Sequence, residues 1–213
     1  GTPSYIVVEN LELVHAKDIY TYKDYAGATT TYSLMASAIF IERGSNITVR
    51  NCIIRDNGQG IFSYYKDGAN YSSDLLVEGC HVYNNGNDGS YTEHNSYTES
   101  LRVTFQYNRF ENPVYGSNLK DRSAGFICRY NWVRNGQREF DLVEAEDSPN
   151  ELAVAAEYNL VYMYGNVIVE DEAAGNRQFI HFGGDHKPTQ SYFRTGPLYL
   201  YNNTFVSYRT DVT

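Results

Sequence analysis

Two cations lie two residues apart in the segment "NLKDRS", which spans residues 118–123. Alternate side chains of an extended strand share one face, so Lys120 and Arg122 are predicted to point the same way. An ammonium and a guanidinium on one face can together neutralise a carboxylate, and the guanidinium can bind it through two parallel hydrogen bonds. The pair therefore indicates a candidate anion-binding or catalytic site.

Other residues capable of proton transfer lie in short runs that align with this segment. Each run precedes a repeated segment that contains an asparagine, described below. When the runs are aligned on that asparagine, Tyr97 pairs with Lys120 and Glu99 pairs with Arg122. Parallel strands lie about 4.8 Å apart, so each pair is predicted to be in close contact. These aligned runs are predicted to form one series of parallel strands, called the lane here. The lane contains four further ionisable residues, namely His94, Asp141, Glu144 and His181.

Each of these residues also has a purely structural interpretation. Lys120, Glu99 and Arg122 could form a solvated cross-strand ion-pair ladder, which contributes little stability. His94 could cap a turn, and His181 could be a structural histidine between two phenylalanines.

Metal binding is a further alternative at this lane. His181, Asp185 and His186 could ligate a metal ion, although their spacing does not place them on one strand face. The segment from Asp185 onward otherwise indicates an exposed loop. The three cysteines form no C-x-x-C pair, which argues against a zinc site.

The elements that must position these residues are visible as a repeat. Seven segments align without internal gaps at intervals of roughly 23 to 41 residues, and they are "IVVENLEL" (6–13), "ITVRNCII" (47–54), "LLVEGCHV" (75–82), "VTFQYNRF" (103–110), "FICRYNWV" (126–133), "VYMYGNVI" (161–168) and "LYLYNNTF" (198–205). The first, third and eighth columns are apolar throughout, and a mostly polar column lies between the first and third. This alternation is typical of half-buried strands.

Asparagine and glycine recur in the middle of each segment. Five of the seven residues in the fifth column are Asn or Gly, which tolerate a left-handed backbone, so the chain is predicted to bend there. The sixth column contains four successive asparagines, Asn108, Asn131, Asn166 and Asn203. Their amides are predicted to stack and to satisfy inward-facing turn groups, with Cys52 and Cys80 continuing the stack as small buried residues.

This pattern resembles the right-handed parallel β-helix proteins of the pectate-lyase-like superfamily, which contain a stacked asparagine ladder. The resemblance covers residues 6–205 and implies an all-β solenoid of about seven rungs in one domain, residues 1–213. Neither end offers an amphipathic cap. The chain is therefore expected to be a fragment with additional flanking segments, or to form an oligomer.

The resemblance also implies a secreted or cell-surface protein that acts on polysaccharide. In β-helix polysaccharide lyases the base is typically Lys or Arg, often with Ca²⁺ bridging the substrate carboxylate. Carried over to this chain, Lys120 would be the base, Arg122 the carboxylate clamp, and Tyr97 or His94 the acid that assists the leaving O4. Asp141 and Glu144 could hold Ca²⁺ or, together with Glu99 and His181, bind sugar hydroxyls.

Two other function classes fit the same repeat. A glycoside hydrolase could use paired carboxylates such as Asp141 and Glu144, and a structural β-helix could serve as an adhesin, phage-spike segment or filament subunit. The chain lacks the pectate lyase signatures and the N-K-S run of alginate and chondroitin lyases.

Composition limits the partners. A formal net charge of −9 over 213 residues argues against nucleic acid, and it would repel an anionic polysaccharide unless local cations or a bound cation compensate. No stretch approaches the roughly 20 apolar residues of a membrane span.

Overall fold

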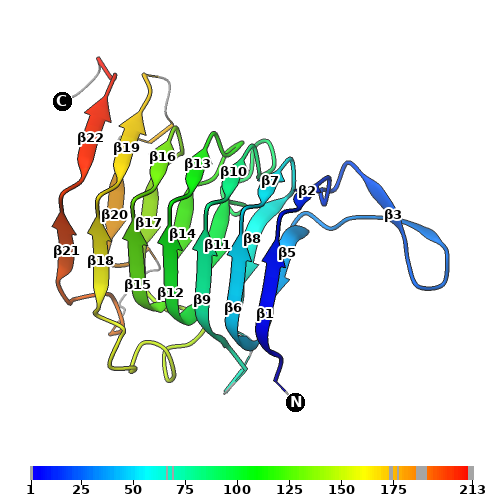
Figure 1. The fold of residues 1–213 in the computed structure, drawn as a ribbon, viewed down its shortest axis with the longest axis horizontal. Coiled ribbons are helices and arrows are strands. Elements are labelled where there is room, and N and C mark those ends of the chain that lie inside the picture. Colours follow the sequence, from blue (N-terminus) through cyan, green and yellow to red (C-terminus); the bar gives the residue numbers. More distant parts are fainter. Residues whose placement is uncertain are drawn as a thin grey trace.

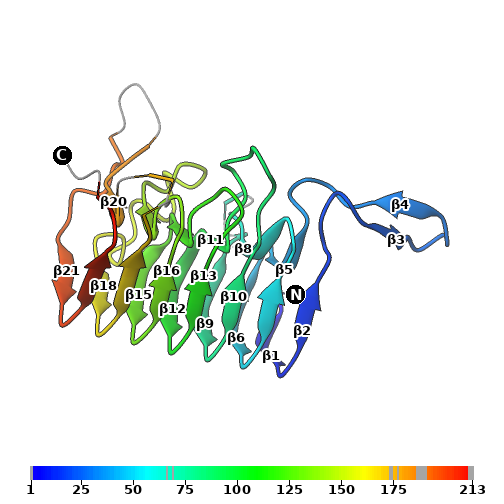
Figure 2. The same ribbon diagram turned by 90° about the horizontal axis from the view of Figure 1, so that it is seen from above.

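The computed structural model describes residues 2–65, 67–68, 70–172, 175–176, 178–185 and 191–210. These residues form three parallel sheets that run side by side along the molecule, with each turn of the chain adding one strand to each sheet (Figure 1, Figure 2). Seven strands make up the first sheet and seven the second, so the solenoid has seven rungs and the predicted parallel β-helix is confirmed.

The first sheet consists of β1 (Ser4–Glu9), β6 (Gly44–Arg50), β9 (Ser72–Glu78), β12 (Ser100–Gln106), β15 (Ala124–Arg129), β18 (Val161–Tyr164) and β21 (Leu198–Tyr201). The second sheet consists of β2 (Glu12–Val14), β7 (Ile53–Arg55), β10 (His81–Tyr83), β13 (Arg109–Glu111), β16 (Trp132–Arg134), β19 (Val167–Glu170) and β22 (Thr204–Ser207). The third sheet consists of β5 (Ser37–Ile41), β8 (Gln59–Ser63), β11 (Ser96–Thr98), β14 (Leu119–Asp121), β17 (Phe140–Leu142) and β20 (Ile180–Phe182).

The strand register follows the predicted columns. The first column pairs from Ile6 through Ile47 and onward to Leu198, each residue opposite its counterpart on the next rung. The eighth column, from Leu13 to Phe205, pairs in the same way on the second sheet. In the middle rungs these side chains are fully buried and form one continuous core. Burial of the apolar columns therefore fixes the register, because a slip by one residue would expose them.

The predicted bend lies between the first and second sheets. All seven residues of the fifth column have positive φ, including the two tyrosines Tyr107 and Tyr130. The asparagine ladder of the sixth column is also confirmed. Asn131 accepts hydrogen bonds from the backbone N–H (2.9 Å) and side-chain amide (3.0 Å) of Asn108, and its own amide donates to the carbonyls of Phe105 and Arg129. Polar groups at this turn are therefore paired inside the core.

Insertions extend from the solenoid. The Tyr-rich segment after β2 forms an antiparallel hairpin of β3 (Thr21–Lys23) and β4 (Thr29–Thr31), which projects from one end of the body (Figure 2). Longer connections follow β10 and β17. Among the described residues, no helix is long and apolar enough to cross a membrane.

Candidate functional site

A single outward-facing column crosses the third sheet. Strand pairing places Phe62 on β8 opposite Tyr97 on β11, Tyr97 opposite Lys120 on β14, Lys120 opposite Asp141 on β17, and Asp141 opposite His181 on β20. The predicted contact of Tyr97 with Lys120 is confirmed, with Nζ 5.9 Å from the ring centroid. The column therefore changes from aromatic to charged at β14.

The charged part of this column opens into a pocket of about 550 Å³. Five of the eight predicted site residues line this pocket. Four of them were expected to be catalytic, namely His94, Tyr97, Lys120 and Arg122, and the fifth is Asp141. Asp185, considered above only as a possible metal ligand, also lines the pocket. The remaining wall residues were not singled out in the sequence, and they include Tyr91, Tyr115, Gln137, Arg138 and Glu146. Glu99, Glu144 and His181 do not line the pocket.

Lys120 is held between two carboxylates. Its Nζ donates to Asp141 Oδ2 at 2.9 Å and to Asp185 Oδ2 at 2.6 Å, and only 11% of its side chain is exposed. Asp141 is held in turn by His181, whose Nδ1 lies 2.7 Å from Oδ1. Burial alone would raise the pKa of Asp141, but His181, Lys120 and Arg138 lower it well below the usual range, so Asp141 is a carboxylate.

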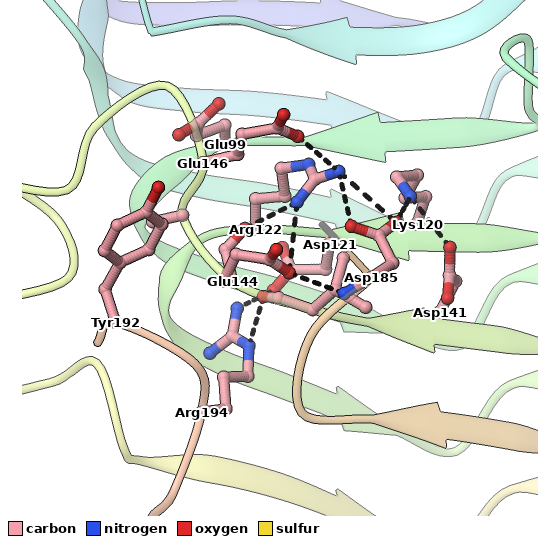
Figure 3. A network of polar contacts seen from close by, with 12 residues as sticks. Glu99, Lys120, Asp121, Arg122, Asp141, Glu144, Glu146, Asp185, Tyr192 and Arg194 are labelled. Atoms are coloured by element: carbon pink, nitrogen blue, oxygen red, sulfur yellow. Dashed lines mark hydrogen bonds and ion pairs between the residues drawn. The ribbon is translucent and has the colours of Figure 1, made fainter. Parts of the chain in front are cut away.

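Arg122 lies deeper, with 5% of its side chain exposed, and nearly every edge of its guanidinium is bonded (Figure 3). Nε donates to the Tyr97 hydroxyl at 2.9 Å, and one terminal nitrogen donates to the Glu144 carbonyl at 2.7 Å. The other terminal nitrogen contacts Asp185 Oδ1 at 3.1 Å and Glu146 Oε2 at 3.0 Å. These contacts fix the orientation of the planar group and direct one N–H edge to the two pocket carboxylates.

Tyr97 and His94 both present protons to the pocket. Burial raises the pKa of the Tyr97 hydroxyl, so this group stays protonated, and its oxygen already accepts from Arg122. Burial, with Lys120 nearby, lowers the pKa of His94 to about 3, so the imidazole is neutral. Because the Ser117 N–H donates to Nδ1 at 2.9 Å, the ring proton lies on Nε2. Both groups are therefore suited to donate a hydrogen bond.

The solvated ion-pair ladder of Lys120, Glu99 and Arg122 is not what the structure contains. Both cations are largely buried and pair with Asp141, Asp185 and Glu146, whereas Glu99 accepts a hydrogen bond from Ser148. Burial raises the pKa of Glu99 to about 8, so it is a protonated acid at neutral pH.

Glu144 is also fully buried, and it accepts the backbone N–H of Asp185 at 2.9 Å. Glu99 and Glu144 thus lie behind the pocket wall and have no surface for a sugar to contact. Asp185 does lie on the predicted exposed loop, but its carboxylate turns inward onto the two cations.

A buried ion pair anchors the strand that carries the cations. Asp121 lies between Lys120 and Arg122 and points to the opposite face, where its Oδ2 accepts from Arg194 at 3.0 Å. Neither side chain has appreciable exposure. Arg194 also donates to the carbonyls of Val143 and Ser123. Arg194 could not be predicted from the sequence, since no local pattern connects it to β14.

A second buried polar ladder supports the pocket from the turn before the third sheet. Its members run through Asn57, Asn85, Asn95, Asn118 and Glu139, each side chain bonded to the next. Burial raises the pKa of Glu139 to about 7. This ladder fixes the loops that carry the pocket walls, and irregular loop lengths conceal it in the sequence.

The residues proposed for calcium have other partners. Asp141 is bonded by Lys120 and His181, and Glu144 faces the Asp185 backbone. No group of three or more His, Cys, Asp or Glu among the described residues could hold a metal ion, and His186 lies outside those residues. The carboxylates of Asp141 and Glu144 are thus already bonded within the protein.

Comparisons with known proteins identify the fold family. No curated protein and no solved structure gives a significant match. A family model described as "Right handed beta helix region" matches residues 23–152, which include the asparagine ladder of the middle rungs and the strands that carry Tyr97, Lys120 and Asp141. The chain belongs to the right-handed β-helix family.

Proposed function

We propose that this protein binds an acidic polysaccharide in the pocket of the third sheet and cleaves it by β-elimination. One observation carries the proposal: His94, Tyr97, Lys120 and Arg122 line the same pocket. They supply two cations and two proton donors within one site. A protein of net charge −9 needs such a local cluster of cations to hold an anionic chain.

Each of these pocket residues would have a separate role in the reaction. Elimination from a uronate develops negative charge on the C6 carboxylate while the C5 proton leaves, and the guanidinium of Arg122 would stabilise that charge. Tyr97 or His94 would donate to the departing O4. Lys120 remains our candidate for the base. It can take the C5 proton only as a neutral amine, so its ammonium group must first pass a proton to Asp141, Asp185 or water.

Tyrosines on the pocket walls support a sugar ligand. Tyr91 and Tyr115 pack edge to face with ring centroids 4.7 Å apart, and both line the pocket. Aromatic rings offer flat, amphipathic surfaces for sugar rings. A polymeric substrate of this kind also places the protein outside the cytoplasm, in the extracellular space, the periplasm or at the cell surface.

The direct test is incubation with polymers of galacturonate, glucuronate, mannuronate and guluronate, with and without Ca²⁺. Formation of the unsaturated uronate, measured by its ultraviolet absorbance, supports the lyase. Lys120→Gln should abolish that signal, whereas Lys23→Gln on the projecting hairpin should leave it unchanged. Absence of the unsaturated product from every polymer would contradict the proposal.

Hydrolysis is the second candidate, and one observation favours it. Asp141 and Asp185 both contact the same ammonium, so two carboxylates lie close together in the pocket. The carboxylate that lies beside Asp141 is therefore Asp185, and not Glu144 as predicted for a hydrolase. The pKa values of both groups are lowered, so neither is a protonated general acid at neutral pH, which ranks hydrolysis second. Reducing ends without ultraviolet absorbance would favour it, and silence in both assays would favour a structural role.

A further inference from the structure

The carboxylate of Asp185 occupies a site that is built for a carboxylate. Its Oδ2 accepts from Lys120 Nζ at 2.6 Å, and its Oδ1 lies 3.1 Å from the facing terminal nitrogen of Arg122 (Figure 3). An ammonium and a guanidinium edge therefore converge on one carboxylate group. Charge-assisted contacts of this kind are short and strong, and they are stronger where water is excluded.

The cations are fixed independently of Asp185. Arg122 is oriented by the Tyr97 hydroxyl and the Glu144 carbonyl, and it retains Glu146 as a counter-charge. Lys120 is paired with Asp141 on the neighbouring strand. Removal of the Asp185 carboxylate would therefore leave a pre-formed binding site with both cations in place.

The backbone N–H of Asp185 is anchored by Glu144, so its side chain is the part that can exchange. Asp185 follows β20 by three residues, on the connection that begins at Gly183, where φ is +129° and an added Cβ would meet, beyond its chain neighbours, no atom of the described residues within 4 Å. Its side chain is 27% exposed, compared with 3% for Asp141. Asp141 is held on a strand between neighbouring rungs, so of these two counter-charges Asp185 is the one that can leave.

We propose that Asp185 is an internal ligand that occupies the position of the substrate's uronate carboxylate, and that an acidic glycan binds by displacing it. The inference rests on the proposed function, because it names the subsite that recognises the acidic group. It also explains how a pocket with nearly balanced charges can select an anion, since one carboxylate replaces another on the same two cations. Neutral sugars cannot make that exchange.

The test compares Asp185→Ala and Asp185→Asn with the unchanged chain. Calorimetric titration with uronate oligosaccharides should show tighter binding by both variants, by about tenfold or more, because the internal competitor is gone. The methyl esters of the same oligosaccharides should bind all forms equally. Asp171→Asn, which removes an aspartate paired with Arg134 on another sheet, is the matched control and should change nothing. Unchanged or weaker uronate binding by both Asp185 variants would overturn the inference.

A smaller probe separates this inference from the proposed function. Acetate or free glucuronate should raise the melting temperature of Asp185→Ala, and it should do so less for the unchanged chain and for Asp171→Asn. If that shift occurs while no polymer is bound or cleaved, the carboxylate site is real and the proposed function is wrong. If the polymer is cleaved but acetate stabilises all three forms alike, Asp185 is not an internal ligand.

Discussion

Arg122 Nε donates a hydrogen bond of 2.9 Å to the hydroxyl oxygen of Tyr97. The tyrosine oxygen is thereby used as an acceptor, which leaves its own proton available for donation, and both residues line the pocket. Burial keeps that proton in place by raising the pKa of the hydroxyl. The arrangement combines a cation with a proton donor and leads to the first prediction.

Tyr97→Phe should lower kcat by about 100-fold or more while changing KM little, because a positioned proton donor contributes roughly that factor. The ring contacts with Phe62 and His94 would remain. Steady-state kinetics on the polymer identified in the lyase assay provides the measurement. Tyr164→Phe is the matched control, since its hydroxyl accepts a hydrogen bond of the same length from Arg129 on another sheet. Equal effects of the two substitutions would exclude a chemical role for Tyr97.

Asn131→Ala should destabilise the fold by at least about 2 kcal/mol, because it leaves the Phe105 and Arg129 carbonyls and the Asn108 N–H unpaired inside the core. Chemical denaturation with circular dichroism measures this change. Asn203→Ala, at the partly exposed last rung of the same ladder, should have a smaller effect. A silent Asn131→Ala would show that the ladder does not stabilise the turns.

Arg194→Met should destabilise the protein by about 3–5 kcal/mol, because it leaves the buried Asp121 carboxylate without its partner. The double substitution Arg194→Met with Asp121→Asn should recover part of the loss, and a double-mutant cycle measures the coupling. Since Asp121 lies between Lys120 and Arg122, the single substitution should also reduce activity below the unfolding temperature. Additive effects of the two substitutions would show that the pair is not coupled.

Glu99 should contribute stability that is lost as pH rises between about 4.5 and 8, because its pKa is near 4.5 when unfolded and about 8 when folded. In that window the folded state binds more protons than the unfolded state, so raising the pH favours unfolding, by up to about 1.4 kcal/mol per pH unit. Glu99→Gln should flatten this dependence and stabilise the protein more at pH 8 than at pH 5. Urea unfolding at a series of pH values tests this, and a profile unchanged by Glu99→Gln would rule out a buried, protonated Glu99.

Much of the fold could be predicted from single columns of residues. The apolar positions from Ile6 to Leu198 recur with the same alternation in every rung, and burial of that alternation allows one register only. The same register placed Tyr97 beside Lys120, because strands that are adjacent in a solenoid carry aligned residues to one face.

The partners of those residues were harder to predict. Glu99 aligns with Arg122, yet its carboxylate bonds Ser148, which lies on the long connection after β17. The asparagines of the second ladder stand in loops of unequal length, so they form no column in the sequence. The sequence pattern can indicate which face of the sheet a side chain occupies. The path of the inserted loops determines which residues that side chain contacts.

The sequence by itself determined the register of the repeated strands, the position of the bend and the strand that carries Lys120 and Arg122. These features depend on short-range alternation and on residues that accept positive φ. Only the tertiary structure decided that Asp185, 65 residues beyond Lys120, would reach back to both cations, and that Arg194 would lock the strand from behind. Contacts at that separation depend on how loops return to the solenoid. No local preference of the backbone encodes that return, so the chemical character of the pocket follows from the folded chain.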